Sequence, residues 1–382
     1  MLTSEDIAGK LSEGVLNKYF ENGDQYYASK DKSSEYQLID ELDENKLKEE
    51  LCEANYFVNN NTNIFFEEKT DYLKSNICLY ELGGICCQNF CINGLYYNII
   101  DDIILEFYFN EYENNYHDLL TTNIKFSIGG NNINGTMIKM EYNILLCELM
   151  GKKMVIENNT VKINSCHFEQ LKNNFQKNNK IYQCNGFPLF VAMFHNLSID
   201  IFSNIPNIGM IIKHRKINNQ NYIEEMQGKD YEFPIIGIRE INDINIINSI
   251  SQNLCINLIG KFMIIKLKCE DDSLINLHQI NLFLNKLSPI EYNIYLDEIK
   301  ELNMFENRYF IISMSPLFKN IKDLSNNLKN GNIGKYGINF SRMDNINIEI
   351  NDIKDNIKID ICFFYLNIVT LKSGMIGGKF FY

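Results

Sequence analysis

The sequence predicts an all-β protein, because strand-length runs of alternating apolar and polar residues recur along most of the chain. In residues 346–350, isoleucines alternate with Asn347 and Glu349, which is the period-two pattern of a half-buried strand. Residues 357–371 begin with the same alternation and then become apolar on both faces, as in a strand that starts at a solvated edge and ends buried. Asn and Asp residues between these two runs supply turn chemistry. Two long strands around such a turn favour a β-sandwich.

Length and composition favour a globular protein with two hydrophobic cores. A chain of 382 residues can build both, and a single domain is the less favoured alternative. Apolar residues make up 45% of the chain and aromatic residues 12%, which is ordinary for a globular protein. The net charge of −13 argues against a dedicated nucleic-acid-binding protein, which would need a basic face, and it favours solubility.

The sequence carries no segment that we expect to cross a membrane or to direct secretion. No apolar run approaches the ~20 residues that span a bilayer, and the longest candidate, residues 187–194, contains a proline. The first residues are acidic where a signal peptide would be basic. Eleven cysteines without a secretion signal are typical of reduced, mostly buried thiols. We therefore expect a chain that is cytosolic or assembled in the cytosol.

Residues 1–75 differ from the rest, and we expect them to form an acidic, partly helical arm. Residues 4–20 and 37–56 have apolar residues at helical spacing, which suggests two amphipathic helices, and polar segments at Ser33-Ser34 and residues 59–63 punctuate them. A flexible acidic leader is an equally good interpretation. Leucines recur there at helical spacing amid Glu and Lys residues, at Leu38, Leu42, Leu47 and Leu51.

The middle of the chain mixes strand and helix patterns. Residues 101–109 predict a strand, and the alternation of residues 124–128 ends at Gly129-Gly130, which is a hairpin signal. In residues 136–150, apolar positions recur every three or four residues, which predicts a helix. Residues 187–199 predict a pair of strands, with Pro188 at a strand start or edge because proline donates no ladder hydrogen bond.

The second half of the chain continues this style without a detectable sequence repeat. Residues 258–269 and 309–314 predict strands, and residues 272–287 allow a helix. Residues 339–345 form a polar, turn-like cluster after a glycine-rich segment. Glycines after residue 373 are expected where the backbone turns or passes closely.

Two motifs in the last part of the chain carry a family resemblance. They are NFSRMDN at residues 339–345 and YLNIVTLKSGMIGG at residues 365–378. Both are similar to sequences of the double jelly-roll major capsid proteins of large nucleocytoplasmic DNA viruses, which have an NFSRID turn and an ending close to NYNILRIMSGMGG. The resemblance covers residues 91–382, and before them only residues 63–66 faintly resemble the family's usual first strand. Further segments resemble the family in the same order, at residues 101–109, 124–149, 187–199, 221–227 and 308–316.

The resemblance implies an all-β fold of two consecutive eight-stranded jelly rolls, at residues 76–227 and 228–382, after the arm of residues 1–75. In the family, three copies form a pseudo-hexameric capsomer of an icosahedral shell. The resemblance therefore implies a homotrimeric structural virion protein that is not an enzyme and assembles in the host cytoplasm. Its implied partners are neighbouring capsomers and minor capsid proteins, with an internal viral membrane as a further option and no direct contact with nucleic acid. The chain is shorter than typical members, so we expect reduced surface loops.

Two alternative functions stay open at this point. One is a scaffold that shapes an immature viral membrane, as a poxvirus relative of this fold does. The other belongs to a different class, a glycan-binding β-sandwich or an enzyme on a jelly-roll frame. That class would need an aromatic groove or a His/Glu metal clamp, and neither is visible in the sequence.

Cysteines provide the best candidates for a metal site. Zinc sites usually pair two clamps, and here no second clamp follows the group formed by Cys78, Cys86, Cys87 and Cys91, although Cys166-His167 and Cys184 are present. His195 lies in an apolar segment and is better explained as a hydrogen-bonded core residue. We therefore predict that Cys86, Cys87, Cys91 and His195 bind no metal.

The remaining polar motifs also have structural explanations. Asp101-Asp102 and Glu224-Glu225 would point to opposite faces on strands, so they make no glycosidase pair. The basic run of residues 213–216 is best interpreted as a solvated strand end, with contact to acidic lipid headgroups as the alternative. No partner for His117, His214 or His278 can be placed from sequence. The sequence therefore predicts no catalytic residue and no cofactor.

Overall fold

The structure is a computed structural model. It describes residues 66–378, with gaps at 75, 83–84, 110–115, 133–136, 179–185, 193, 247–251, 254–257, 269–279, 285–292, 296–307, 316–319, 334–336, 343–345, 351–356 and 373. The described residues form two compact units. The first unit holds the residues up to Ile235, the segment Leu328–Ile333 and the residues from Asn367 onward, and the second unit holds the rest.

The division between the units falls inside two strands, β13 (Tyr231–Ile246) and β21 (Ile357–Lys372). The boundary expected from sequence, between residues 227 and 228, lies a few residues before this division. The end of β21 belongs to the first unit, whereas the prediction from sequence placed all residues after 227 in the second domain. The assignment of one jelly roll to each predicted segment stays a prediction.

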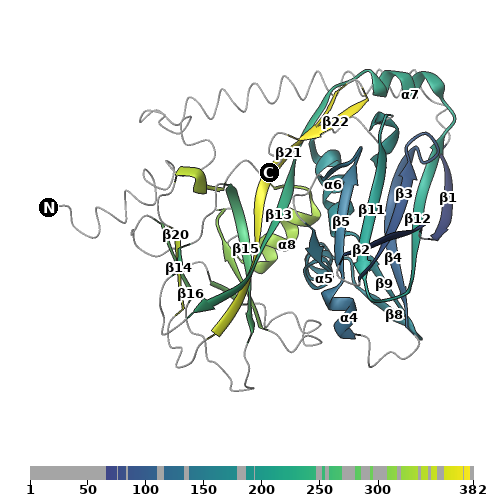
Figure 1. Ribbon diagram of the computed structural model, residues 1–382. Helices are drawn as coiled ribbons and strands as arrows, with labels where there is room; N and C mark the ends of the chain where they lie inside the picture. The colour runs from purple at the N-terminus through teal and green to yellow at the C-terminus, as the bar shows by residue number, and fades with distance from the viewer. Residues whose placement is uncertain are drawn as a thin grey trace, which may run out of the picture. The chain divides into compact units, whose positions relative to one another are not determined.

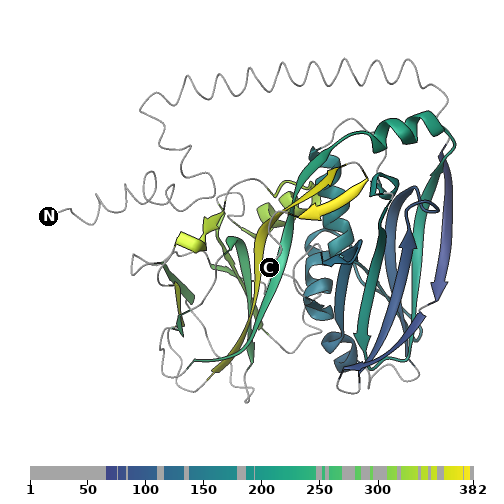
Figure 2. The ribbon, with the colours of Figure 1, turned by 45° about the horizontal axis from the view of Figure 1, so that its top comes forward.

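The first unit is built from two antiparallel sheets, shown in Figures 1 and 2. One sheet has the order β1 (Phe66–Lys74), β12 (Asn207–Ile217), β4 (Ile99–Tyr108), β9 (Thr160–Asn164), β8 (Val155–Glu157), with β10 (Phe187–Pro188) beside β4. The other has the order β2 (Asn76–Leu82), β3 (Ile85–Asn93), β11 (Asn196–Ser203), β5 (Asn123–Ile128), β6 (Asn131–Asn132), with β7 (Ile138–Lys139) beside β5. From β3 onward the long strands alternate between the two sheets, as they do in a jelly roll.

The core of the first unit follows from this alternation, because every second residue of a strand points to the same face. Inward side chains of both sheets are buried, as expected of two sheets that pack on one another. They include Phe90 and Ile92 on β3, Ile103, Leu105 and Phe107 on β4, Ile124 and Phe126 on β5, Ile199 and Ile201 on β11, and Met210 and Ile212 on β12.

Helices cover one side and one end of this unit. α5 (Met140–Leu149) and α6 (Cys166–Asn178) lie on the side next to β5 (Figures 1 and 2). α4 (Tyr116–Thr121) contacts α5. α7 (Gln220–Gln227) contacts the short 3-10 helix η2 (Leu189–Ala192), and its first turn is capped by Asn219, whose side chain accepts a hydrogen bond from the Tyr222 amide.

The second unit is also antiparallel. Its larger sheet has the order β13, β21, β15 (Ile259–Lys268), β18 (Arg308–Ser313), β17 (Asn293–Tyr295), with β19 (Ile338–Asn339) beside β15 and β22 (Met375–Gly378) beside β21. β22 pairs with the end of β21 that belongs to the first unit. The smaller sheet has the order β14 (Gln252–Asn253), β20 (Ile346–Ile350), β16 (Ile280–Leu284). The helical elements are α8 (Ile321–Lys329), whose last two residues belong to the first unit, and η5 (Phe340–Arg342).

Most strands predicted from sequence are confirmed. They are the strands at residues 101–109, 124–128, 258–269, 309–314, 346–350 and 357–371, which correspond to β4, β5, β15, β18, β20 and β21. The helix predicted in residues 136–150 is confirmed as α5, and the hairpin at Gly129-Gly130 joins β5 to β6. The prediction of an all-β fold is therefore correct.

Three predictions from sequence are wrong in part. The apolar segment 187–199 is not a strand pair, because η2 occupies residues 189–192 between β10 and β11. Residues 280–284, where a helix was allowed, form β16 instead. Residues 66–74, assigned to the arm, form β1, which pairs along its whole length with β12. The helices expected in residues 4–20 and 37–56 lie outside the described residues.

Candidate functional site

The cysteines considered for a metal site differ in burial and are spread over different elements. Cys87 and Cys91 are both on β3, where Cys87 is buried and Cys91 is exposed. Cys166 and His167 are buried at the start of α6. Among the described residues, no three His, Cys, Asp or Glu side chains are grouped so as to hold a metal ion. The side chain of Cys86, as well as Cys184 and His278, lie outside the described residues, so the predicted absence of a metal stays a prediction.

His195 occupies a turn and not a strand, which corrects the sequence-based placement. Its backbone amide donates to the Ala192 carbonyl at 2.8 Å, directly before β11. Its half-buried imidazole packs over Gly129, whose φ is +61°. A side chain at position 129 would collide with the imidazole, so glycine is needed there for the turn and for this close approach. The role of His195 is therefore to support the β5–β6 hairpin.

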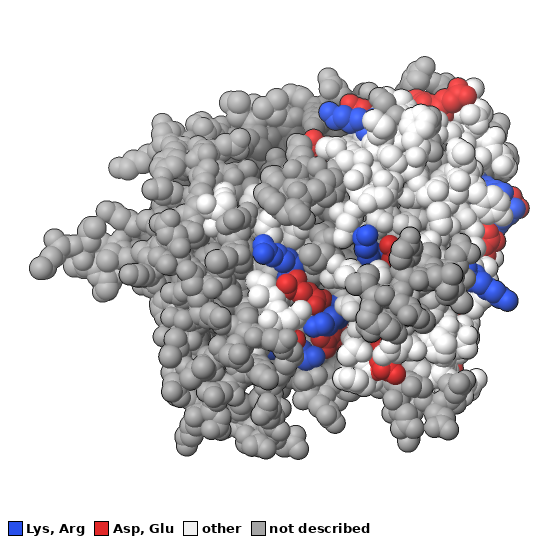
Figure 3. All heavy atoms as spheres, viewed as in Figure 1, with Lys and Arg blue, Asp and Glu red and all other residues white. Residues whose placement is uncertain are grey.

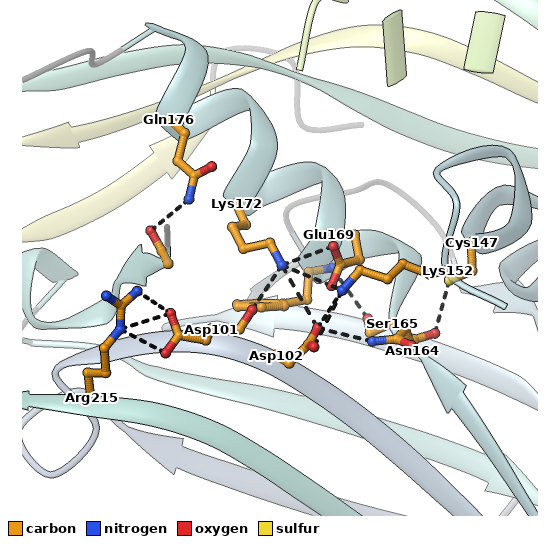
Figure 4. Close-up of polar contacts among 12 residues, drawn as sticks. Asp101, Asp102, Cys147, Lys152, Asn164, Ser165, Glu169, Lys172, Gln176 and Arg215 are labelled. Carbon is orange, nitrogen blue, oxygen red and sulfur yellow. Dashed lines mark hydrogen bonds and ion pairs between the residues drawn. The ribbon is translucent and has the colours of Figure 1, made fainter. Parts of the chain in front are cut away.

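Four charged side chains meet inside the first unit in a group that we call the ionic cluster. It consists of Asp102 on β4, Lys152 after α5, and Glu169 and Lys172 on α6 (Figure 4). Lys172 Nζ lies 3.0 Å from Glu169 Oε2 and 3.9 Å from Asp102 Oδ1. Lys152 Nζ lies 3.1 Å from Asp102 Oδ1 and 3.6 Å from Glu169 Oε1. Each lysine therefore contacts both carboxyl groups.

Backbone irregularity lets two adjacent carboxylates reach different partners. The pairing of β4 with β12 shifts by one residue at Asp101, which is a β-bulge. Asp101 then forms a forked contact with the Arg215 guanidinium, while Asp102 faces α6 and accepts a hydrogen bond from Asn164 at 3.1 Å (Figure 4). Lys172 also donates to the Asp101 carbonyl at 2.9 Å. The cluster therefore ties α6 to the backbone of β4 as well as to its side chains.

The two carboxyl groups of the cluster differ in pKa because their surroundings differ. Burial raises the pKa of Glu169 to about 7, against an ordinary value of 4.5, and the neighbouring Asp102 adds to the shift. Burial alone would raise the pKa of Asp102, but a hydrogen bond with Glu169 and the charges of Lys172 and Lys152 lower it below 3.8. The pKa of Lys152 is raised because the attraction of Glu169 and Asp102 outweighs its burial. Protons taken up on acidification therefore go first to Glu169.

Two buried cysteines and a buried histidine beside the cluster lack the properties of catalytic groups. Burial raises the pKa of the Cys147 and Cys166 thiols, so both remain neutral, and only thiolates are strong nucleophiles. Burial lowers the pKa of His167 to about 3, which keeps its imidazole neutral against Phe126. These residues fit packing of α5 and α6 better than covalent chemistry.

Sequence reasoning did not find the ionic cluster. Its members are separated by about 50 residues or more between β4 and the helical segments, so no local spacing joins them. A usable signal was present in α6, where Phe168, Leu171 and Phe175 recur at helical spacing around Glu169 and Lys172. A charged pair three residues apart within such an apolar pattern indicates a helix that buries its charges.

The basic run of residues 213–216 on β12 is largely neutralised by its neighbours. Arg215 contacts Asp101, and the Lys216 ammonium lies 4.4 Å from the centre of the Tyr96 ring. His214 is buried with Nε2 3.3 Å from Asp71 Oδ2, and Lys213 is exposed. A cavity of about 580 Å³ beside this run is lined by both signs of charge, at Glu68, Lys69, Thr70, Asp101, Lys213, His214 and Arg215.

The surface charges and exposed apolar side chains suit contact with other proteins. On the face shown in Figure 3, positively and negatively charged side chains of the described residues lie close to one another. Leu95 and Phe194, which lie on turns, and Met375, the first residue of β22, are 71%, 62% and 59% exposed. The Phe194 amide donates to the carbonyl of Gly374, directly before Met375, and the Phe190 amide on η2 donates to the carbonyl of Asn98, three residues after Leu95. Within the described part of the chain, the helices are too short or too polar to span a bilayer.

Comparisons with known proteins give matches at the level of the fold. No family model matches the sequence, and no curated protein matches it. A chain of the PBCV-1 virus capsid superposes with a TM-score of 0.52 and 11% identity, over 83% of this chain and 98% of that one. The crystal structure of PBCV-1 VP54, fitted into a reconstruction of the virophage Sputnik, matches with a TM-score of 0.51 and 10% identity over the same shares. The resemblance to double jelly-roll capsid proteins is thus confirmed for the fold.

Proposed function

We propose that this chain is a structural protein of a viral capsid. The observation that carries the proposal is the shared fold, which extends over 98% of the PBCV-1 capsid chain. The ordered motifs at residues 339–345 and 365–378 support the same assignment independently. Several charged side chains of the first unit join one element to another, as the ionic cluster and the Asp101–Arg215 contact illustrate. A non-catalytic role suits such an interior.

Self-association is the activity that such a protein performs. We propose that three copies form a pseudo-hexameric capsomer, that capsomers and minor capsid proteins assemble into an icosahedral shell, and that assembly occurs in the host cytoplasm. The exposed Leu95, Phe194 and Met375 support a role for this end of the first unit in protein contacts. Closure around a threefold axis satisfies such surfaces without leaving an open, polymerising end. The net charge of −13 favours protein partners over nucleic acid.

The native mass of the purified chain tests the proposed trimer. Multi-angle light scattering on the purified full chain should give three times the monomer mass of 44.7 kDa. Replacing Phe194 by Ser should leave the folded chain intact, because this side chain is mostly exposed, and should weaken trimerisation if this end forms the contact. Asn219→Ser, which retains a capping side chain, serves as the matched surface control. A monomer at micromolar concentration would contradict the trimer and would favour a minor capsid protein or a scaffold.

A further inference from the structure

Four exposed apolar side chains lie beside η2 in the first unit, in a group that we call the apolar end. Its members are Leu95, Tyr96, Phe194 and Met375. Each of these residues is between 49% and 71% exposed. Exposed apolar side chains that gather in one place, unlike those scattered singly, mark a surface that contacts another segment or a partner.

Strand pairing and a hydrogen bond bring these side chains together. The last residue pair between β3 and β11 is Asn93 with Asn196. Leu95 follows this pair by two residues, and Phe194 precedes it by two. Because neighbouring strands are about 4.8 Å apart, both residues leave adjacent strand ends. The Phe194 amide also donates to the carbonyl of the residue before Met375, so β22 joins the same surface.

The described part of the chain begins beside this surface. Its first residue, Phe66, opens β1 and pairs with Ile217 at the end of β12. The Ile217 amide donates at 3.0 Å to the side-chain oxygen of Asn98, two residues after Tyr96. The ammonium group of Lys216 lies 4.4 Å from the centre of the Tyr96 ring. Residues 1–65 therefore lead into the fold next to the apolar end.

The sequence places an apolar group shortly before this entry point. It is Tyr56-Phe57-Val58, and the polar residues 59–63, four of them asparagine, separate it from the next apolar residues. Asparagine is a turn-forming residue, so this separation allows the chain to reverse its direction. Eight residues lead from Val58 to Phe66, and they span roughly 29 Å at most when fully extended. The apolar group therefore stays within reach of the apolar end.

We propose that residues 56–58 dock on the apolar end of the same chain. Docking removes apolar surface of both parts from water, which is favourable and needs no matching hydrogen bonds. A short tether holds the segment at an effective concentration in the millimolar range, so it outcompetes a second copy at micromolar concentration. The inference does not rest on the capsid proposal, because the segment docks whether or not copies of the chain assemble.

Limited digestion of the full chain by chymotrypsin, which cleaves after aromatic residues, tests the docking. A docked segment is cleaved only when it opens, so cleavage after Tyr56 and Phe57 reports the docked fraction. The double substitution Leu95→Ser with Phe194→Ser should accelerate this cleavage by about 10-fold or more. Cleavage after Tyr26 and Tyr27, elsewhere in residues 1–65, should keep its rate and serves as the internal reference.

A matched substitution controls for the loss of an exposed apolar side chain. Val155 is 43% exposed on β8, which lies at the opposite edge of the sheet from β1. Val155→Ser should therefore leave cleavage after residues 56 and 57 unchanged. Equal cleavage rates in the unmodified chain and in the double variant of Leu95 and Phe194 would overturn the proposal.

Photo-cross-linking identifies the occupant of the apolar end. Leu95→p-benzoylphenylalanine in the full chain should form links to residues 56–58. In a mixture of chains with and without a heavy-isotope label, these links should join residues of one chain. Links between a labelled and an unlabelled chain, or no link to residues 56–58, would overturn the proposal. A trimeric mass together with either of these results would leave the capsid proposal standing on its own.

Discussion

Removal of Lys172 is the sharpest test of how α6 is held. Lys172→Met keeps the length and apolar stem of the side chain but deletes the ammonium group. The substitution removes the 3.0 Å contact with Glu169, the 2.9 Å hydrogen bond to the Asp101 carbonyl and the longer contact with Asp102. Among the described residues, Glu169 then keeps only Lys152, at 3.6 Å, as a cationic neighbour. A buried carboxyl group is left without its closest counter-charge.

The expected cost follows from this loss. Breaking a buried ion pair by deleting one partner costs about 3–5 kcal/mol, because the remaining charge stays desolvated. For a unit of roughly 200 residues, this corresponds to a decrease in Tm of about 10 °C. Chemical denaturation and differential scanning calorimetry at pH 8, where Glu169 is ionised, measure both quantities. The decrease should be smaller at pH 5, where the neutral carboxyl needs no counter-charge.

A matched surface substitution supplies the control. Lys162→Met removes an ammonium 2.7 Å from Glu157, whose side chain is well exposed, and should cost less than about 1 kcal/mol. The double substitution Lys172→Met with Glu169→Gln should recover at least half of the lost stability, because it removes both members of the closest buried pair. Equal costs for Lys172→Met and Lys162→Met would refute the view that the cluster is a buried support.

Three further substitutions test local features of the first unit. Gly209→Ala should cost about 1 kcal/mol, because a Cβ would displace the Tyr72 hydroxyl from its 2.7 Å hydrogen bond with Tyr108. It should cost nothing in a Tyr72→Ala chain, and urea denaturation in both backgrounds shows whether this coupling exists. Gly129→Ala should cost about 1–3 kcal/mol in thermal melts, and removing the His195 ring should restore only part of this, since φ stays at +61°. Asn219→Ala should lower the free energy of unfolding by about 1 kcal/mol through loss of the α7 cap, and this decrease should be the same at pH 5 and at pH 8.

The strands were predictable because their signal is local. In β20 and the first part of β21, one face is apolar and the other polar, and this alternation is readable in any five consecutive residues. The helix α5 was found for the same reason, although nearly all its residues are buried. Residues 187–194 were misread because a continuous apolar run has no period, and burial on all sides suits η2 as well as a strand.

The site was not predictable, because it depends on contacts between distant segments. Asp102 was considered only together with Asp101, as two carboxylates on opposite faces of a strand. The bulge opposite residues 213 and 214 determines which partners the two carboxylates reach, and a bulge leaves no composition signal there. Lys152 follows α5 and Lys172 lies within α6, so their approach to Asp102 depends on how both helices pack. Local patterns contain none of this information.

A buried ionic cluster in a structural protein calls for an explanation, because apolar residues of similar size would stabilise the chain equally well or better. α6 buries the apolar side chains of Phe168, Leu171 and Phe175. Hydrophobic packing is non-directional, so these side chains alone would tolerate a helix that slides or rotates along the unit. The ionic cluster is directional. It binds one turn of α6 to one carboxylate and one carbonyl of β4, so that only one placement satisfies all four charges. We infer that the cluster specifies the position of α6 rather than adding net stability.

The double substitution Lys172→Met with Glu169→Gln separates these roles, because it should retain most of the stability while the α6 amides lose protection from hydrogen exchange relative to those of β4. Unchanged protection of α6 in that chain would assign its position to apolar packing alone.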